Sequence, residues 1–268
     1  MIRNIAMCVA YDGTEFYGWQ DQIELRTVQS VLTQAVRLAV QHQVTLTGSG
    51  RTDRGVHAAG HVSSFLTTNE LPPDRLRHSI GSRLPKDLTI VDMWEVRGDF
   101  HATQHALGKL YRYRIHNAPG KPVEMRAQQY VYHCWHELDL ALMQEAGRRF
   151  VGTHDFAAMA GKSAPRLTTV RSVFRCDVER HFDEIRIDVE GGGFLYKQVR
   201  NMVGTLINVG RGQWVPEKVD DILASGDRTN AGPTAPACGL CLQWVRYPAE
   251  LLRPDPAFAR RTIDDPTE

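Results

Sequence analysis

Residues 109–117 read Lys-Leu-Tyr-Arg-Tyr-Arg-Ile-His-Asn, an alternation of apolar or aromatic side chains with basic ones. Successive side chains of a β-strand point to opposite faces, so this period predicts a strand with two unlike faces. Tyr111 and Tyr113 would lie on the face that packs. Arg112 and Arg114 would lie on the other face, where they can contact phosphate.

The segments on either side of this strand supply further helices and strands. Apolar residues recur at helical spacing over residues 28–39, with Thr27 placed to cap the first turn. Further helices are predicted at 74–84, 138–150 and 194–209, and from Pro216 to residue 225. Further strands are predicted at 2–10, 61–66, 88–96, 170–179, 184–190 and 240–247. Because many of these strands meet at hairpin range, the sequence predicts an α+β fold with mainly antiparallel sheet rather than a doubly wound parallel fold.

Composition places the chain among ordinary globular proteins. Its 268 residues are 42% hydrophobic and 24% charged, which excludes the disordered and low-complexity classes and allows one large domain or two modest ones. No run reaches the ~20 uncharged apolar residues that a membrane helix needs. The first residues lead directly into the predicted strand at 2–10, without the apolar segment of a secretory signal, so we expect a cytosolic protein.

The charge balance gives a local signal rather than a global one. Lys and Arg number 32 against 31 Asp and Glu, so the net charge is only +1. Between Asp99 and Glu124, however, no carboxylate occurs, while basic residues such as Arg112 and Arg114 do. A local basic stripe indicates nucleic-acid binding. A solvated face balanced by acids elsewhere explains the same pattern equally well.

The cysteines give a weak metal signal. There are five, an odd number, and they are scattered, so disulfides are not expected in this class of chain. Cys238 and Cys241 have CxxC spacing, and His133 with His136 would complete a four-ligand zinc site. The strand predicted around both cysteines favours buried structural thiols instead, and we expect no metal site.

Residues 48–60, Gly-Ser-Gly-Arg-Thr-Asp-Arg-Gly-Val-His-Ala-Ala-Gly, form the most unusual segment of the chain. Two common phosphate-binding motifs fail here, because Asp53 stands where a dinucleotide fingerprint needs glycine and no Gly-Lys-Ser/Thr follows. What remains is Asp53 between Arg51 and Arg54. A neighbouring guanidinium favours the ionised carboxylate and lowers its pKa, which suits a nucleophile or a charge stabiliser. Taken alone, the residues favour a structural ion pair over that role.

Five motifs in order resemble the tRNA pseudouridine synthase A (TruA) family and outweigh that structural interpretation. The run GRTDRGVHA at 50–58 resembles the family signature GRTDAGVHA. The other matching stretches are YDGTEFYGWQ at 11–20 with TVQSVL at 27–32, FHATQHALGKLYRYRI at 100–115, GGGFLYKQVRNMVGTL at 191–206 and DRTNAGPTAPACGLCLQWVRYP at 227–248. Two positions depart from the pattern: Arg54 replaces a usual alanine, and Gln198 replaces a common methionine, where we expect an effect on packing only.

The resemblance implies two RRM-like halves with a catalytic cleft between them. The corresponding halves are residues 1–117, with the catalytic loop and the tyrosine strand, and residues 118–250, followed by a loosely held tail at 251–268. It also implies a homodimer that acts on tRNA, at uridines 38–40 of the anticodon stem-loop. No cofactor is implied.

The resemblance also assigns roles to residues. Asp53 matches the catalytic aspartate, which acts on a uridine flipped out of its stack, and Arg200 matches the arginine that pairs with it. Tyr111 matches the active-site tyrosine, and Leu240 an apolar residue against the base. Extruding that uridine costs a few kcal/mol, which basic residues must supply by gripping the RNA backbone; the candidates for this role are Arg51, Arg54, Lys109, Arg112 and Arg114. A non-catalytic RNA-binding module that stacks bases on Tyr111 and Tyr113 is the alternative.

Overall fold

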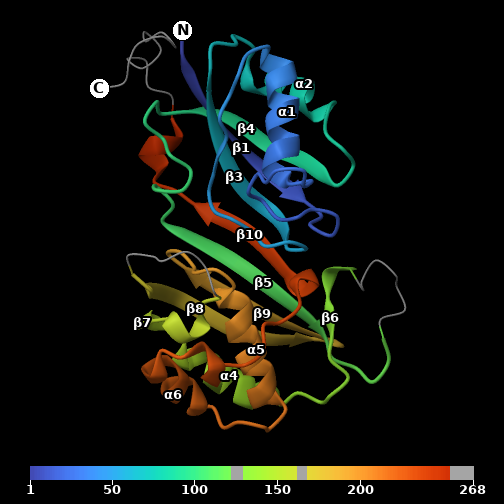
Figure 1. The fold of residues 1–268 in the computed structure, drawn as a ribbon, viewed down its shortest axis with the longest axis vertical. Coiled ribbons are helices and arrows are strands. Elements are labelled where there is room, and N and C mark those ends of the chain that lie inside the picture. The colour runs from blue at the N-terminus through green and yellow to red at the C-terminus, as the bar shows by residue number, and fades with distance from the viewer. Residues whose placement is uncertain (122–128, 162–167, 254–268) are drawn as a thin grey trace. The chain divides into compact units, whose positions relative to one another are not determined.

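A computed structural model of the chain describes residues 1–121, 129–161 and 168–253. The chain divides into two compact units. The first unit is Met1–Leu107 together with the stretch that begins at Gln243, and the second unit is Gly108–Leu242. The division falls between Leu107 and Gly108 and again within strand β10 (Leu240–Arg246). Figure 1 labels most helices and strands of both units.

The first unit is a sheet covered on one face by two helices (Figure 1). Strand β1 is central, pairing antiparallel with β3 on one side and β4 on the other, and the later residues of β10 lie next to β3. The two-residue strand β2 also pairs with β3. The elements are β1 (Arg3–Tyr11), α1 (Val28–Val40), β2 (Thr47–Gly48), β3 (His57–Thr67), α2 (Pro73–Gly81) and β4 (Leu88–Val96), with the short turn η4 (Ala249–Leu252).

The second unit combines mainly antiparallel strands with helices of its own. Its strand order is β5-β9-β8-β7, all antiparallel, with β6 parallel to β5 and the first residues of β10 next to β5. Helices α4 and α5 pack against each other. The elements are β5 (Gly108–His116), β6 (Tyr132–His133), α4 (Leu140–Arg149), β7 (Gly152–Asp155), β8 (Val170–His181), β9 (Glu184–Gly191), α5 (Gln198–Gly210) and α6 (Lys218–Ser225), with the short turns η1 (Ala157–Met159), η2 (Arg228–Asn230) and η3 (Ala237–Gly239).

The predicted α+β class with mainly antiparallel sheet is confirmed, and so is the helix start at Thr27. The Thr27 side chain accepts a hydrogen bond from the backbone N–H of Ser30 at 3.2 Å, which satisfies one of the donors that a helix leaves unpaired at its start. Along β5 the alternation is also as predicted. Tyr113 is fully buried, whereas Arg112 and Arg114 are half-buried.

Helix α5 starts later than its apolar spacing predicts. The predicted helix begins at 194, but Lys197 has a left-handed φ of 60°, which breaks the helical hydrogen-bonding pattern before Gln198. Gln198 is completely buried, and its side-chain Oε1 accepts the backbone N–H of Leu195 at 2.8 Å. The residue that replaces the family's methionine therefore caps the turn before α5 in addition to packing.

The two units are divided differently from the predicted halves. Strand β5, which the sequence places at the end of the first half, belongs to the second unit, because residues 109–116 pair one to one with β9. Residues 243–253 belong to the first unit. Leu251, at the start of the expected tail, is 5% exposed and packs beside Phe100; residues 254–268 lie outside the described part of the chain.

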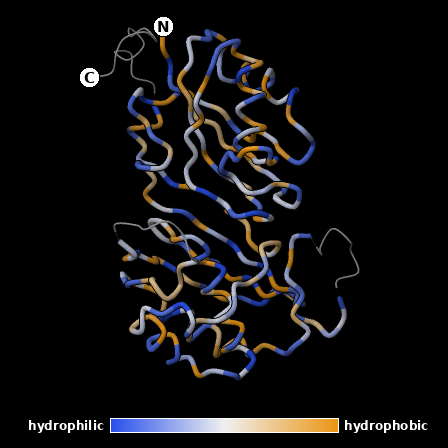
Figure 2. The backbone as a smooth tube through the Cα atoms, viewed as in Figure 1, coloured by the Kyte–Doolittle hydropathy of each residue, from blue (hydrophilic) through white to orange (hydrophobic). Residues whose placement is uncertain are grey.

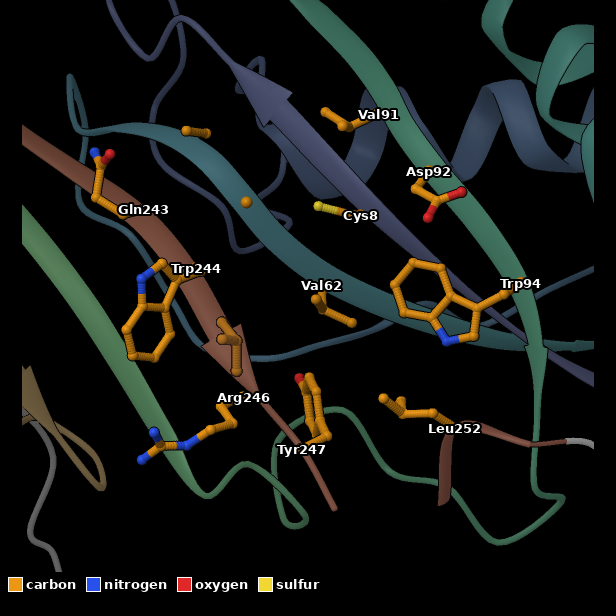
Figure 3. A pocket seen from close by; sticks show the side chains of 13 residues that line it. Cys8, Val62, Val91, Asp92, Trp94, Gln243, Trp244, Arg246, Tyr247 and Leu252 are labelled. Atoms are coloured by element: carbon orange, nitrogen blue, oxygen red, sulfur yellow. The ribbon is translucent and has the colours of Figure 1, made fainter. Parts of the chain in front are cut away.

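The helix-free face of the first unit is partly open. A cluster that includes Val62, Phe100 and Tyr247 covers part of it. Beside this cluster lies a pocket of about 700 Å³, lined mainly by apolar and aromatic side chains, with Trp94 and Trp244 on opposite sides (Figure 3). Apolar and polar stretches are interspersed along the chain (Figure 2), and none of the helices in the described ranges is long and apolar enough to cross a membrane.

Candidate active site

The Asp53 loop of the first unit is attached to the segment that follows β1. The side-chain hydroxyls of Tyr11 and Thr52 are 2.8 Å apart and share a hydrogen bond, and the backbone N–H of Trp19 donates to the Thr52 carbonyl at 3.1 Å. On the other side of the aspartate, the N–H of Val56 donates to the Asp53 carbonyl at 3.1 Å and closes a turn. Hydrogen bonds on both sides thus fix the backbone that carries the Asp53 carboxylate.

Two glycines in the 11–20 segment make this attachment possible. A Cβ on Gly13 would lie 2.1 Å from the Val56 carbonyl oxygen, and one on Gly18 would lie 2.5 Å from the Thr52 oxygen. Gly18 also has φ +89°, a conformation that only glycine adopts readily. The glycines of YDGTEFYGWQ therefore let two backbones touch, and the motif serves to position a loop that lies 34 to 43 residues further along the chain.

A buried histidine holds the start of the loop. His61 on β3 is completely buried and stacks on the Trp19 ring, with centroids 3.7 Å apart. Its Nε2 lies 2.9 Å from the Gly50 carbonyl oxygen, so this nitrogen carries the proton and donates. Sequence reasoning missed His61, because one histidine within a strand pattern carries no spacing signal.

The arginines beside Asp53 are both exposed, but they differ in their contacts. The Arg54 guanidinium lies over the ring of Tyr17, 4.2 Å from its centroid. This cation–π contact positions the extra positive charge that Arg54 brings in place of the family's alanine. Arg51 makes no hydrogen bond or ion pair with any residue that the structure describes. Its charge is therefore available to an anion from outside the chain.

In the second unit the two tyrosines of β5 have different environments. The hydroxyl of Tyr113 donates to the Pro236 carbonyl at 2.8 Å, and burial raises the pKa of this phenol well above its usual value. Tyr113 is therefore a structural residue. Tyr111 is 8% exposed and meets the ring of Phe194 edge to face, with centroids 5.4 Å apart. Phe194 sits in the glycine-rich turn before α5 and orients the Tyr111 ring.

Arg200 on α5 is tied to the segment that precedes β10. Its Nε donates to the Ala235 carbonyl at 2.7 Å, and the N–H of Ala235 donates back to the Arg200 carbonyl at 3.1 Å. The bond from Nε orients the guanidinium, and the backbone bond joins α5 to the same segment. Gly204 allows the approach, since a Cβ there would lie 1.7 Å from the Pro233 oxygen. Leu240, which follows the same segment, is 5% exposed.

Asn201 is the second residue that sequence reasoning missed. It is completely buried and its amide nitrogen donates to the Met159 carbonyl at 2.7 Å. Its Oδ1 accepts from the Thr234 hydroxyl at 2.6 Å and from Arg228 at 3.0 Å, while burial lowers the pKa of Arg228. This network fixes the segment that holds Arg200. A polar residue next to Arg200 on an apolar helix face was the available signal.

The predicted basic stripe of β5 is balanced within the second unit. Arg112 forms two hydrogen bonds with Asp188, at 2.8 and 2.7 Å, and Arg114 forms two with Glu184, at 3.0 and 2.5 Å. Both carboxylates come from β9, which lies beside β5. The hydrogen bond to Asp188 raises the pKa of Arg112. Of the two interpretations of this stripe, acids elsewhere in the sequence do balance Arg112 and Arg114.

The residues of the possible zinc site have other contacts. His133 Nε2 lies 3.0 Å from the Ala118 carbonyl, the His136 ring stacks on Trp135, and the Cys238 thiol points to the Val131 carbonyl at 3.6 Å. Within the described ranges, no three His, Cys, Asp or Glu side chains form a group that could hold a metal ion. All five cysteines are free thiols.

The candidate residues are thus distributed over the two units, each set in ordered surroundings. Asp53, Arg51 and Arg54 belong to the loop of the first unit. The candidates of the second unit are Tyr111, Arg112, Arg114, Arg200 and Leu240.

Comparison with known proteins identifies the class to which this fold and these residues belong. Residues 7–103 and 146–248 match the family described as tRNA pseudouridine synthase. The chain belongs to this family and is therefore classed with the isomerases.

Named relatives agree over almost the full length. The chain is 40% identical to tRNA pseudouridine synthase A 2 of Clostridium perfringens over 246 residues, which cover 92% of this chain and all of that protein. It is 42% identical to tRNA pseudouridine synthase A of Ruminiclostridium cellulolyticum, with the same coverage of both chains. A solved structure of a Cbf5–Nop10–Gar1 complex matches with a TM-score of 0.33 and 12% identity, covering 89% of this chain and 58% of that one.

Proposed function

We propose that this enzyme isomerises uridine to pseudouridine at positions 38–40 in the anticodon stem-loop of tRNA, with Asp53 as the nucleophile. The observation that carries the proposal is the Asp53 loop. Within a family named for this reaction, the backbone that carries the Asp53 carboxylate is fixed by two hydrogen bonds, one from the Trp19 N–H to the Thr52 carbonyl and one from the Val56 N–H to the Asp53 carbonyl, and a reacting group needs such a fixed position.

The reaction rearranges the bonds of one nucleotide. The N1–C1′ bond breaks, the uracil turns, and a C5–C1′ bond forms, while C5 loses a proton and N1 gains one. No atom is added overall, so neither an oxidant nor a second substrate is required. A carboxylate can form a transient covalent bond to the sugar or to the base, which divides one difficult step into two easier ones. Asp53 is assigned that role.

The uridine must leave its stack to reach the carboxylate, which costs a few kcal/mol. Tyr111 is assigned to stacking on the extruded base, which is worth about 1–3 kcal/mol. Its ring is held edge to face by Phe194, which supports this role. Arg200 and Leu240 are assigned to the same nucleotide. The oriented guanidinium of Arg200 and the burial of Leu240 support the assignments.

The arginines assigned to the RNA backbone differ in what binding requires of them. Arg51 is exposed and has no ion pair among the described residues, so it can meet a phosphate directly. Arg112 and Arg114 must first exchange their carboxylate partners for phosphate. We therefore rank Arg51 as the strongest of these contacts and place Arg54, stacked on Tyr17, between them.

The assembly follows from the resemblance. We propose a homodimer that acts in the cytoplasm, where tRNA is its substrate. Sedimentation of the purified protein at micromolar concentration checks the first part, since a monomer at that concentration would contradict it.

Chromatography of the nucleosides from digested tRNA tests the proposed reaction. The wild type should convert a transcribed tRNA that carries uridine at positions 38, 39 and 40, and replacing these uridines one at a time by cytidine shows which positions react. Asp53→Asn should yield no pseudouridine. Asp21→Asn, an exposed aspartate in the same unit, should retain full yield. Tight tRNA binding by the wild type without any pseudouridine would support the non-catalytic RNA-binding module instead.

A further inference from the structure

A second, smaller pocket lies in the first unit beside the Asp53 loop. Its volume is about 310 Å³, and it is separate from the pocket of Figure 3. Three parts of the chain contribute lining residues: Trp19, Gln20 and Gln29 from the first, residues 46–48, 50 and 51 from the second, and Thr103 from the third. Among these lining residues Arg51 carries the single charge, and none is acidic. Asp53 is not one of them.

The floor of the pocket is tightly built. Gly48 lies against the Trp19 indole so closely that a Cβ on the glycine would be 2.6 Å from the ring. The Thr103 hydroxyl donates to the Gly48 carbonyl at 2.6 Å, so a hydrogen bond holds Thr103 against the Gly48 side of the pocket. The His61 ring stacks on the other residue of this floor, Trp19, and hydrogen-bonds to Gly50. The pocket is therefore preformed.

Two glutamines fix a hydrogen-bonding edge on the pocket wall. The Gln29 amide donates to the Leu46 carbonyl at 3.0 Å, while its Oε1 accepts the backbone N–H of Asp21 at 2.9 Å. A carbonyl can only accept and a backbone N–H can only donate, so the orientation of the Gln29 amide is unambiguous. Its Oε1 then also accepts from Gln20 Nε2 at 2.9 Å, which orients the Gln20 amide in turn.

Gln20 consequently presents one acceptor and one donor that are not used within the described part of the chain. The Oε1 atom and the second N–H of its amide have no partner there. A glutamine amide held in this way can form a paired donor and acceptor contact with the edge of a nucleobase. Arg51 stands at the same pocket, where a guanidinium can bind the phosphate of that nucleotide.

We propose that this pocket binds one nucleotide of the tRNA other than the uridine that is isomerised, with Gln20 reading the base edge and Arg51 binding the phosphate. The volume lies at the lower end of the ~300–1,000 Å³ range of small-ligand pockets, enough for one base and too small for a helical stem. The isomerised uridine needs a carboxylate, which this pocket does not contain. The proposal rests on tRNA being the substrate, as proposed above.

Equilibrium binding of a transcribed tRNA tests the pocket. Gln20→Leu should raise the Kd by roughly 5- to 150-fold, the range expected for losing a paired contact to a base. Gln43→Leu, an exposed glutamine in the same unit, should bind as the wild type does. Arg51→Ala provides a second variant at an exposed position, where loss of folding is not a concern; it should weaken binding and lower the salt-dependence slope by about one.

A scan of tRNAs with single abasic sites through the anticodon stem-loop identifies the base. At one position, distinct from the isomerised uridine, removing the base should raise the Kd of the wild type by the same factor as the Gln20→Leu substitution does. The same abasic tRNA should not raise the Kd of Gln20→Leu any further. The proposal is overturned if every abasic position raises the Kd of Gln20→Leu by the same factor as it raises that of the wild type. It is also overturned if Gln20→Leu binds the intact tRNA with the wild-type Kd. Competition by adenosine and uridine monophosphates tests whether the pocket binds a free nucleotide. They should not compete with tRNA, and Gln20-dependent competition would assign the pocket to free nucleotide instead.

The experiments distinguish a failure of the pocket proposal from a failure of the proposed reaction mechanism. If Asp53→Asn still forms pseudouridine, the nucleophile assignment is lost while the Kd measurements keep their meaning. If Asp53→Asn is inactive and the abasic scan shows no position coupled to Gln20, only the pocket is lost.

Discussion

Replacing Gly18 by alanine should damage catalysis through the position of Asp53. Gly18 has φ +89° and lies so close to the Asp53 loop that an added Cβ would be 2.5 Å from the Thr52 oxygen. Real Cβ contacts are essentially never closer than 3.0 Å, so the loop must move by about 0.5 Å. The displaced backbone includes Asp53 itself, whose carbonyl carbon would be 3.1 Å from the new atom.

The size of the effect follows from these distances. Misplacing a reacting group by ~1 Å costs about 100-fold, so a displacement of half that amount should lower kcat by roughly 10-fold. The left-handed backbone adds a stability cost of about 1–2 kcal/mol for a residue with a Cβ. In a chain of this length each kcal/mol lowers the Tm by about 2–4 °C. Gly18→Ala should therefore remain folded at 25 °C and show a reduced kcat.

Gly212→Ala is the matched control. Gly212 has φ +69°, but nothing lies within 4 Å of its added Cβ. It should therefore lose a similar amount of stability and keep the wild-type kcat. Single-turnover pseudouridine formation and thermal unfolding of both variants make the comparison. If Gly18→Ala lowers only the Tm, as Gly212→Ala does, the backbone contact between the 11–20 segment and the loop does not set the position of Asp53.

Two further predictions concern the second unit. Asn201→Ala removes the donor to the buried Met159 carbonyl and the acceptor of the half-buried Thr234 and Arg228, and should lower the urea unfolding free energy by about 2–4 kcal/mol. Exposed Asn230→Ala should change it by less than about 0.5 kcal/mol, and equal losses in the two variants would refute the network. At Glu184 burial raises the pKa, but the bonds from Arg114 and Arg186 outweigh it, so the net pKa is lowered from 4.5. This stabilisation is complete above about pH 4.5 and lost as pH falls through the folded-state value. Glu184→Gln should therefore unfold more easily at pH 7 and lose less stability on acidification, and parallel curves of unfolding free energy against pH would contradict this.

Local periodicity predicted most elements of the fold. The alternation of β5, the strand at 88–96 and the cap at Thr27 all depend on neighbouring residues, which are visible in sequence. The start of α5 was missed because it depends on the left-handed Lys197, a backbone state that apolar spacing does not report.

The surroundings of the candidate site depend on residues distant in sequence. The carboxylates that balance Arg112 and Arg114 come from β9, more than 65 residues away, so a stretch without acids along the chain is not a basic surface in space. Position 18 requires glycine because the Thr52 carbonyl lies against it. The orientation of the Gln20 amide is set by its hydrogen bond to Gln29, whose own amide is oriented by the Leu46 carbonyl. Motif resemblance named Asp53, but the contacts that hold its loop required the structure.

Release of tritium from tRNA labelled at uracil C5 is the most direct test of the claim that Asp53 starts the reaction. In a single turnover the wild type and Asp21→Asn should release the label from the reacting uridine to water. Asp53→Asn, checked for an unchanged Tm, should release none above background. Release by Asp53→Asn at the wild-type rate would contradict the account.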